Sequence, residues 1–497
     1  MDYKNDSSKV ALYELNIKKY PKKSPFHPDK SYPEYPFKKT SVNKNFVYEA
    51  FRNLLVLMNL DVENFNSTDW NPLGKIIKPG DTVTIKPNLV IDNLNKQNFI
   101  TTHPSLIRAV TDYVLIALKG KGRLIIGDAP LQKCDFKKLV NYIGLIDILE
   151  FYSDNGVNAQ LIDFRKEYLI TNQIKSLKTK KNVRIINLKG DPNGYTEIDL
   201  GNQSFHHLIN SNEMFRKYKV TNYDPKIMNK AHSRFYHKYI ISNSILKADV
   251  IINLPKIKSH RKAGITGGLK NIVGINGNKD WLPHHTIGSL QENGDEYPNK
   301  DIMKTLYTKI NIYNDLLLIN NPIIHNLLFY PIFLIKTILL KILKFNANNG
   351  ILEGSWYGND TIWRTIGDLN QILFYADKEG KLRKETQRKC ILFYDGIIIG
   401  EGEGPMDTEP NHAGILLGGY DPLMIDLAVS ELLDLDYKKI PQLFKIINSN
   451  KNISKNQPEE LKIISNMDYW NNKKIGQLNK TLKFKPTENW INHIEKK

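Results

Sequence analysis

The chain has 497 residues, 41% hydrophobic and 25% charged, which is enough apolar material for a packed core and excludes wholesale disorder. Its 70 Lys and Arg against 52 Asp and Glu give a net charge of +18, which favours nucleic acid, an anionic membrane surface or a phosphorylated substrate as partner, unless it reflects a lysine-rich genome. The two cysteines, Cys134 and Cys390, exclude a disulfide framework and an iron–sulfur cluster held by this chain alone, and suit a reducing cytoplasm.

The first third of the chain alternates between predicted helices and strands. Residues 1–45 are rich in Lys, Pro and Tyr, show no sustained period and no signal peptide, and are expected to form an extended arm. The elements that follow are helix 46–60, strand 82–85, helix 102–118, strand 122–126, helix 135–151 and strand 157–163. Because the connections are short, this alternation predicts an α/β fold with a central, mostly parallel sheet flanked by helices.

Two insertions interrupt this pattern and a tail follows it. Polar, basic residues 165–240 are expected to form an inserted subdomain, and residues 300–350 an amphipathic helical excursion. The alternation continues with strands 248–254, 390–394 and 414–417 and with helix 422–434. We therefore expect an α/β domain over 46–435 and a basic C-terminal extension over 436–497, in which Trp470 and Trp490 are candidate anchors.

The most apolar segment of the chain is 322–345. Pro331 and three lysines argue against a spanning helix, which needs about 20 apolar residues with few charges. The polar residues that share one arc of about 140° on a helical wheel are Lys336, Thr337, Lys341 and Lys344. A wide apolar face with a basic strip is typical of a helix lying on an anionic membrane, so this segment is a candidate peripheral membrane contact. The alternative is a helix that packs on the core or covers an active site.

Several predicted strands end in polar side chains that a simple turn does not require. In α/β proteins, ligands bind beyond the carboxyl ends of parallel strands, so these side chains are expected to converge. The candidate substrate-binding residues are Lys86, Asn88, Lys256, Thr266, Gly267, Lys270, Asn271 and Glu401, and the candidate catalytic residues are His260, Lys258, Asp128 and Asp395. Neighbouring ammonium groups repel, which predicts an anion between them.

Each residue type has an expected role. His260 is the candidate acid or base, with His284 and His285 in the same stretch, and the glycine-containing turn at Gly267 offers backbone N–H groups to a phosphate or carboxylate. The spacing is not that of a Walker A loop. The carboxylates either pair with the lysines or hold Mg²⁺, and Asp421 is either part of that set or a helix cap. No other cofactor is indicated.

The motifs VTIKPNLV, THPSLIRAV, LIIGDAP, ADVIINLPKIKSH, TGGLKNIVG and YDGIIIGEGEGP, with the Asp-Pro and Asp of 421–426, resemble the uncharacterised DUF362 family over roughly 75–435. Some members of that family carry ferredoxin-like iron–sulfur domains. This chain lacks the cysteines, so the resemblance implies no such cluster here. With its 354–360 block (GSWYGND), the chain looks similar to members associated with surface-polysaccharide biosynthesis, in which Trp356, Tyr357 and Trp363 would stack on sugars; core packing is the alternative.

These observations predict an enzyme of unknown reaction class that acts on an anionic, phosphorylated or carboxylated substrate. A small molecule or glycan precursor is the expected ligand, in the cytoplasm or at the inner face of the membrane. The alternative is a non-catalytic protein that binds anionic lipids or glycans at the membrane surface. Nucleic-acid binding has only the net charge in its favour, since the sequence carries no recognised motif or arginine-rich stripe.

Overall fold

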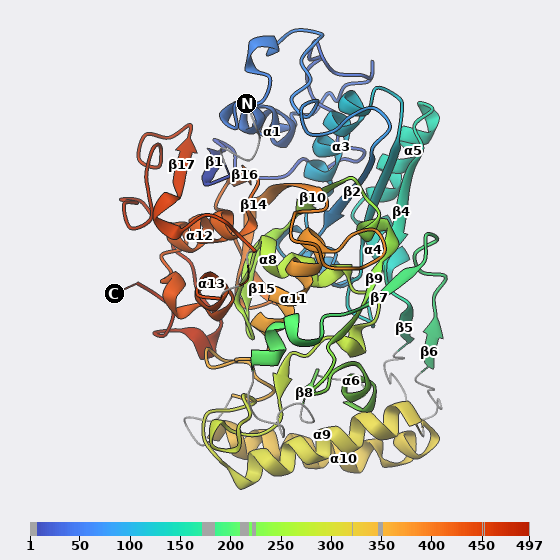
Figure 1. The fold of residues 1–497 in the computed structure, drawn as a ribbon, viewed down its shortest axis with the longest axis vertical. Coiled ribbons are helices and arrows are strands. Elements are labelled where there is room, and N and C mark those ends of the chain that lie inside the picture. Colours follow the sequence, from blue (N-terminus) through green and yellow to red (C-terminus); the bar gives the residue numbers. More distant parts are fainter. Residues whose placement is uncertain are drawn as a thin grey trace.

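The structure, a computed structural model, describes residues 7–170, 184–208, 218–220, 225–320, 322–345, 351–449, 451 and 453–496. Its centre is a twisted mixed sheet (Figure 1). The continuous strand order is β17 (Lys462–Ser465), β1 (Lys9–Glu14), β16 (Ile415–Gly419), β14 (Lys389–Glu403), β10 (Val250–Leu254), β2 (Thr82–Pro87), β3 (Arg123–Asp128) and β4 (Ala159–Asp163). The five strands from β14 to β4 are mutually parallel, which confirms the predicted α/β class with its mostly parallel sheet.

The strands are apolar on both sides because helices cover both faces of the sheet. In β10, Val250 and Ile252 face one core and Ile251 faces the other, as the two-residue period of a strand requires. The first core is formed with α1 (Phe46–Leu57), α3 (Pro104–Leu118), α4 (Phe136–Tyr142) and α5 (Leu145–Asp154). The second core is formed with α8 (Gly268–Asn271), α11 (Ile362–Tyr375), α12 (Pro422–Leu432) and α13 (Pro441–Ile447).

Two predicted elements differ from the structure. The helix expected over 135–151 is two helices, α4 and α5, because Gly144 lies between them with a φ of 77° that other residues rarely adopt. The strand expected over 390–394 continues to Glu403 as β14, where β15 (Asp407–Asn411) pairs with it. Residues 400–403, although half of them are glycine, are thus part of a hydrogen-bonded strand pair.

The N-terminal segment contributes to the sheet. The sequence predicts an extended arm over residues 1–45. In the structure, β1 of this segment lies between two strands of the sheet, parallel to β17 and antiparallel to β16. The C-terminal extension closes the same edge through β17, and the predicted anchors Trp470 and Trp490 are confirmed, since both are completely buried. The two ends of the chain thus support one another through the β1–β17 pair.

The insertion and the excursion lie outside the central sheet. Within 165–240, short strands form the pairs β5 (Glu167–Ile170) with β6 (Arg184–Asn187), and β7 (Tyr195–Asp199) with β9 (Lys238–Ser242), while β8 (Tyr218–Lys219) pairs with β13 (His285–Thr286). The short helices α2 (Gln97–Ile100), α6 (Pro225–Ala231) and α7 (Asn243–Leu246) connect other elements. The excursion is a helical hairpin, α9 (Ile302–Asn320) and α10 (Pro322–Phe345), which lies along one end of the molecule (Figure 1). Among the described residues, no helix is both long and apolar enough to span a membrane.

Candidate functional site

A cavity of about 210 Å³ lies at the carboxyl ends of the parallel strands. The register pairs Lys86 with Asn253 and brings the end of β2 level with the ends of β10 and β3, so the side chains that follow these strands meet there. A second segment reaches it through β11 (Lys256–His260) and β12 (Gly264–Thr266), which leads into α8. The cavity is lined by eight of the predicted residues, namely Lys86, Asn88, Asp128, Lys258, His260, Thr266, Lys270 and Asn271.

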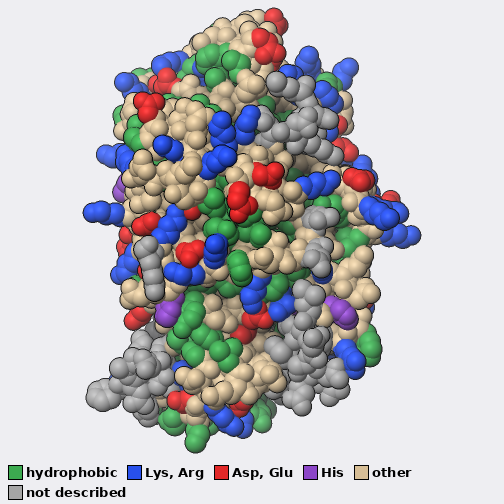
Figure 2. All heavy atoms as spheres, turned by 60° about the vertical axis from the view of Figure 1, so that its left-hand side comes forward, with side chains coloured by type: hydrophobic (Ala, Val, Ile, Leu, Met, Phe, Trp, Pro, Cys, Tyr) green, Lys and Arg blue, Asp and Glu red, His purple; other side chains and the backbone are tan. Residues whose placement is uncertain are grey.

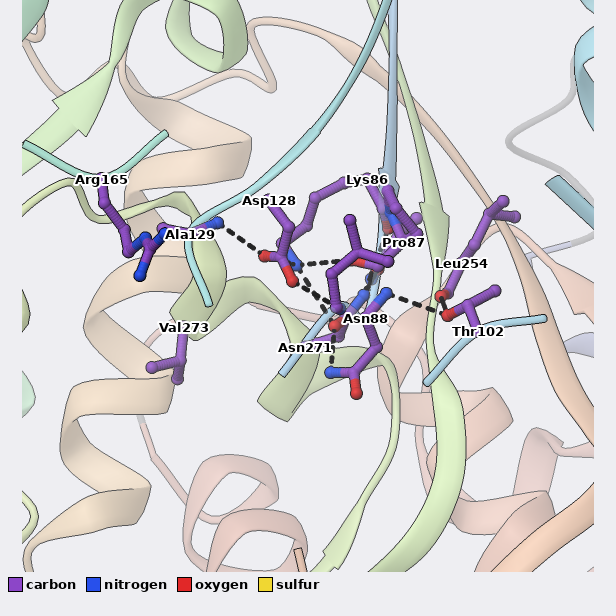
Figure 3. Close-up of polar contacts among 12 residues, drawn as sticks. Lys86, Pro87, Asn88, Thr102, Asp128, Ala129, Arg165, Leu254, Asn271 and Val273 are labelled. Carbon is purple, nitrogen blue, oxygen red and sulfur yellow. Dashed lines mark hydrogen bonds and ion pairs between the residues drawn. The ribbon is translucent and has the colours of Figure 1, made fainter. Parts of the chain in front are cut away.

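Lys86 and Asp128 of the cavity lining form an ion pair (Figure 3). Lys86 Nζ lies 2.7 Å from Asp128 Oδ1, and both side chains are buried. Asp128 also accepts hydrogen bonds from the backbone N–H groups of Leu89 (2.7 Å) and Ala129 (2.9 Å). Burial lowers the pKa of Lys86, and Asp128 opposes that shift. A Cβ atom at Gly274 would lie 2.0 Å from Asp128 Oδ1, so only glycine permits this close approach of the chain.

Two asparagines connect this ion pair to the next lysine. Asn271 Oδ1 accepts from Lys86 Nζ (3.2 Å) and from Asn88 Nδ2 (2.8 Å). Asn88 Oδ1 in turn accepts from Lys258 Nζ at 2.9 Å. Because both amide oxygens are occupied by donors, the orientation of the asparagines is fixed and the two ammonium groups are held at a set separation.

Positive charge exceeds negative charge in the cavity lining. The lining cations are Lys86, Lys133, Lys258, Arg261, Lys262, Lys270 and Lys279, whereas Asp128 is the one carboxylate among the described lining residues. In the described chain, no carboxylate lies within salt-bridge distance of Lys258, Lys270 or Lys279. An uncompensated buried ammonium group is costly, which indicates that a negative ligand completes the site.

The pKa values of these lysines also reflect the excess of positive over negative charge in the cavity lining. Burial lowers the pKa of Lys270 to about 8, with Lys86 adding repulsion, and lowers the pKa of Lys279 to about 7. Burial lowers the pKa of Lys262 to about 7. Burial, together with repulsion from Lys270 and Lys256, holds the pKa of Lys258 well below its usual value. The cavity lining therefore contains lysines whose pKa values lie near neutral pH.

Two histidines of the lining have opposite tautomers. His260 Nδ1 accepts from the backbone N–H groups of Lys262 (3.2 Å) and Ala263 (3.3 Å), which assigns its proton to Nε2. His284 Nδ1 lies 2.7 Å from the Leu282 carbonyl oxygen and must donate to it, which leaves Nε2 as an acceptor. Burial and neighbouring cations, above all Lys270, hold both pKa values well below the usual one. His260 is thus a neutral donor and His284 a neutral acceptor, so the base role fits His284 better than His260.

The turn at Gly267 does not offer free N–H groups as expected. Asp426 accepts from the backbone N–H of Gly268 (2.8 Å) and of Leu269 (3.1 Å), so the N-terminus of α8 is already capped from α12. A Cβ atom at Gly267 would lie 1.9 Å from Asp426 Oδ1, which explains the glycine structurally. Gly267 is outside the cavity lining, while Thr266 is part of it.

Lys256 and Asp395 lie outside the cavity. Lys256 Nζ is 3.1 Å from Asp395 Oδ2 and 2.6 Å from the Tyr20 hydroxyl, which in turn donates to Asp395 Oδ1. Asp395 also accepts from the His103 N–H at 2.8 Å. The expectation that Lys256 joins the other lysines is wrong, because the register of β11 against β14 shifts between Lys256 and Lys258. This ion pair is buried and satisfied by protein groups.

The remaining carboxylates do not assemble around the cavity. Glu401 accepts from Asn411 Nδ2 at 2.9 Å, beside β15, and is outside the lining. Asp421 caps α12 by accepting from the N–H of Leu423, which confirms the helix-cap alternative. Among the described residues, no three His, Cys, Asp or Glu side chains lie close enough to hold a metal. The expected Mg²⁺ ligand set of Asp128, Asp395, Glu401 and Asp421 is therefore not brought together.

Four polar lining residues between Arg261 and His284 are absent from the candidate site residues, as are Gln132 and Lys133. Arg261 and Lys262 directly follow β11, whereas Lys279 and His284 lie in connecting segments without a recognisable spacing. The one available signal is position, since all four occur within about 25 residues of the predicted strand end at His260. The lining also includes the apolar residues Val90, Leu131, Val220, Val273, Leu282 and Met406.

Fold and site together define an α/β protein with a buried cationic cavity at the carboxyl edge of its sheet. The family model described as "Domain of unknown function (DUF362)" matches residues 83–188 and 204–431, more than half of the chain. The protein belongs to this DUF362 family.

Two further similarities accompany the family match. A "Thylakoid-associated protein" of Synechocystis is 22% identical over 377 residues, which cover 75% of this chain and 68% of that protein. A crystal structure of a Thermotoga maritima protein matches with 12% identity and a TM-score of 0.29 over 76% of this chain. The chain spans 56% of the length of that structure.

Proposed function

We propose that this protein is an enzyme that binds an anionic substrate, phosphorylated or carboxylated, in the lysine-lined cavity. The observation that carries the proposal is the excess of ammonium groups over carboxylates in the lining. Lys258, Lys270 and Lys279 would neutralise the anion, and Asn88 and Asn271 hold the first of these in position. The His260 Nε2–H would donate to the substrate and His284 Nε2 would accept a proton, as general acid–base chemistry requires.

The substrate class is proposed to be a glycan precursor handled at the cytoplasmic face of a membrane. The apolar residues of the lining would accept the uncharged part of such a molecule, while the lysines bind its charged group. The name of the Synechocystis relative supports a membrane setting, since that protein is thylakoid-associated. On the face of the molecule that Figure 2 shows, the Lys and Arg side chains of the described residues are scattered and form no continuous basic stripe of the kind that nucleic acid requires.

Anion binding is expected to weaken as the pH rises through about 7 to 9. Lys279 and Lys270 have pKa values of about 7 and about 8 without ligand, and a bound anion favours their charged forms. Binding therefore takes up protons above these values, and affinity falls by up to about tenfold per pH unit for each lysine that must be protonated. Calorimetric titration with sulfate, in buffers of different ionisation enthalpy, measures both quantities. A proton uptake of zero, with an affinity that does not change with pH, would contradict anion binding by these lysines.

Exchange of His260 for Ala distinguishes an enzyme from a protein that only binds anionic lipids or glycans. Mass spectrometry of the native protein first identifies the anion that co-purifies. If the protein is an enzyme, His260→Ala lowers turnover of that compound by about 10²–10⁴-fold, because a proton donor is lost, while binding falls far less. His412→Ala, which changes an exposed histidine at β15, is the matched control. Absence of any turnover in the parent protein, with tight binding of the anion, would favour the binding alternative.

A further inference from the structure

The helical hairpin exposes many of its apolar residues and buries several of its polar ones. On α9, two of the buried side chains are polar and bind the body of the protein: Asp315 lies 3.1 Å from Lys219, and Thr308 donates to Glu296 at 2.7 Å. On the outer side, Ile302 is 83% exposed and Tyr313 is 67% exposed. A surface helix in water normally has the opposite arrangement. The inverted polarity indicates that something other than water covers the outer side.

The second helix of the hairpin has the same inverted polarity. Leu327 is 74% exposed, and the other exposed apolar side chains described on α10 are Ile324, Leu328, Tyr330, Phe333, Leu334, Ile335 and Ile338. Lys336 is half-buried instead, with its ammonium group 5.9 Å from the Tyr307 ring on α9. The alternative in which 322–345 packs its apolar face on the core is therefore not met by these side chains. Figure 2 shows hydrophobic side chains on the surface at this lower end of the molecule.

The charges of the hairpin are complementary to an anionic surface. The sequence of α10 contains no Asp or Glu, and the one carboxylate of α9, Asp315, is buried in its ion pair with Lys219. Lys309 and Lys341 are exposed. The outer side of α9 and α10 therefore presents apolar side chains and cations without a compensating carboxylate on either helix.

We propose that the outer face of the α9–α10 hairpin docks on the surface of an anionic lipid bilayer. The two helices lie side by side and run lengthwise, which presents a long, shallow apolar face (Figure 1). Its leucine, isoleucine and phenylalanine side chains enter the boundary between headgroups and acyl chains, and Lys309 and Lys341 meet anionic headgroups. A second copy of this chain is a poorer occupant, because the same cations would face one another without carboxylates between them.

Vesicle co-sedimentation tests this docking. The full chain is mixed with phosphatidylcholine vesicles with or without phosphatidylglycerol, and binding is expected to be much stronger with the anionic lipid. The variant Leu327→Glu/Leu334→Glu/Ile338→Glu is expected to lose about a hundredfold or more in partitioning, since three apolar side chains no longer enter the bilayer. The matched control places three glutamates at exposed apolar positions elsewhere: Tyr142→Glu/Phe235→Glu/Phe444→Glu.

The results distinguish docking on a bilayer from self-association and from a general effect of added negative charge. Support requires that the hairpin variant loses vesicle binding while the control variant keeps it, with both folded and with unchanged sulfate binding in the cavity. Sulfate binding reports the cavity alone, so the docking proposal and the proposed function fail independently. Equal vesicle binding by parent and hairpin variant would overturn the proposal. So would a parent that ignores anionic vesicles but dimerises in solution and becomes monomeric in the hairpin variant.

Discussion

Exchange of Lys86 for Met is expected to lower the free energy of unfolding by about 3–5 kcal/mol, because the buried Asp128 carboxylate loses its counter-ion. Lys86 is completely buried, and its ammonium group is 2.7 Å from Asp128 Oδ1. The two backbone N–H groups that also bind Asp128 do not neutralise its charge. Urea denaturation, followed by tryptophan fluorescence, measures the loss as a lower midpoint with an unchanged slope.

A double variant isolates the interaction between the two charges. Lys86→Met/Asp128→Asn removes both charges and keeps an oxygen that can accept from the Leu89 N–H, so it is expected to be more stable than Lys86→Met alone. Lys121→Met, at an exposed position before β3, controls for the loss of a surface lysine. If Lys86→Met unfolds at the same urea concentration as Lys121→Met, the ion pair does not stabilise the fold.

The positions of the main strands could be predicted from the sequence because each strand is both apolar and sharply ended. Val250 to Leu254 form a strand that is apolar except at Asn253 and is followed by Pro255, and β2 ends at Pro87. Proline cannot continue an interior strand, so the polar residues beside it had to lie at one edge of a parallel sheet. That reasoning placed Lys86, Asn88 and Asp128 together without any knowledge of the connections.

Contacts that depend on register or on distant segments could not be predicted in the same way. Lys256 and Lys258 are two residues apart and would share one face of a regular strand, but the register shift against β14 separates them. Lys256 donates a hydrogen bond to Tyr20, which lies in an N-terminal segment whose sequence shows no helical or strand period. Asp426, which caps α8, is more than 150 residues away along the chain. Such long-range pairs arise from packing and leave no local pattern.

The functional and the structural lysines of the cavity should respond to substitution in opposite ways. Lys86 neutralises Asp128, whereas Lys270 has no carboxylate within salt-bridge distance among the described residues, and burial lowers its pKa to about 8. An unfolded chain holds this lysine at its ordinary pKa of about 10.4. Between these two pKa values the folded state therefore binds fewer protons than the unfolded state, so the charge of Lys270 destabilises the fold. This destabilisation is complete below about pH 8 and absent above about pH 10.4.

Exchange of Lys270 for Met is accordingly expected to raise the free energy of unfolding by about 1–3 kcal/mol at neutral pH, with a gain that disappears as the pH approaches about 10.4. The same variant should bind sulfate about 10–150-fold more weakly, because a charge-assisted hydrogen bond to the anion is lost. Urea denaturation at several pH values and calorimetric titration measure the two effects, with Lys121→Met as the control for both. A variant that loses stability while keeping its affinity would assign Lys270 a structural role. Gain of stability together with loss of binding is what a lysine kept for an anion predicts, since its desolvation is offset only when the ligand is present.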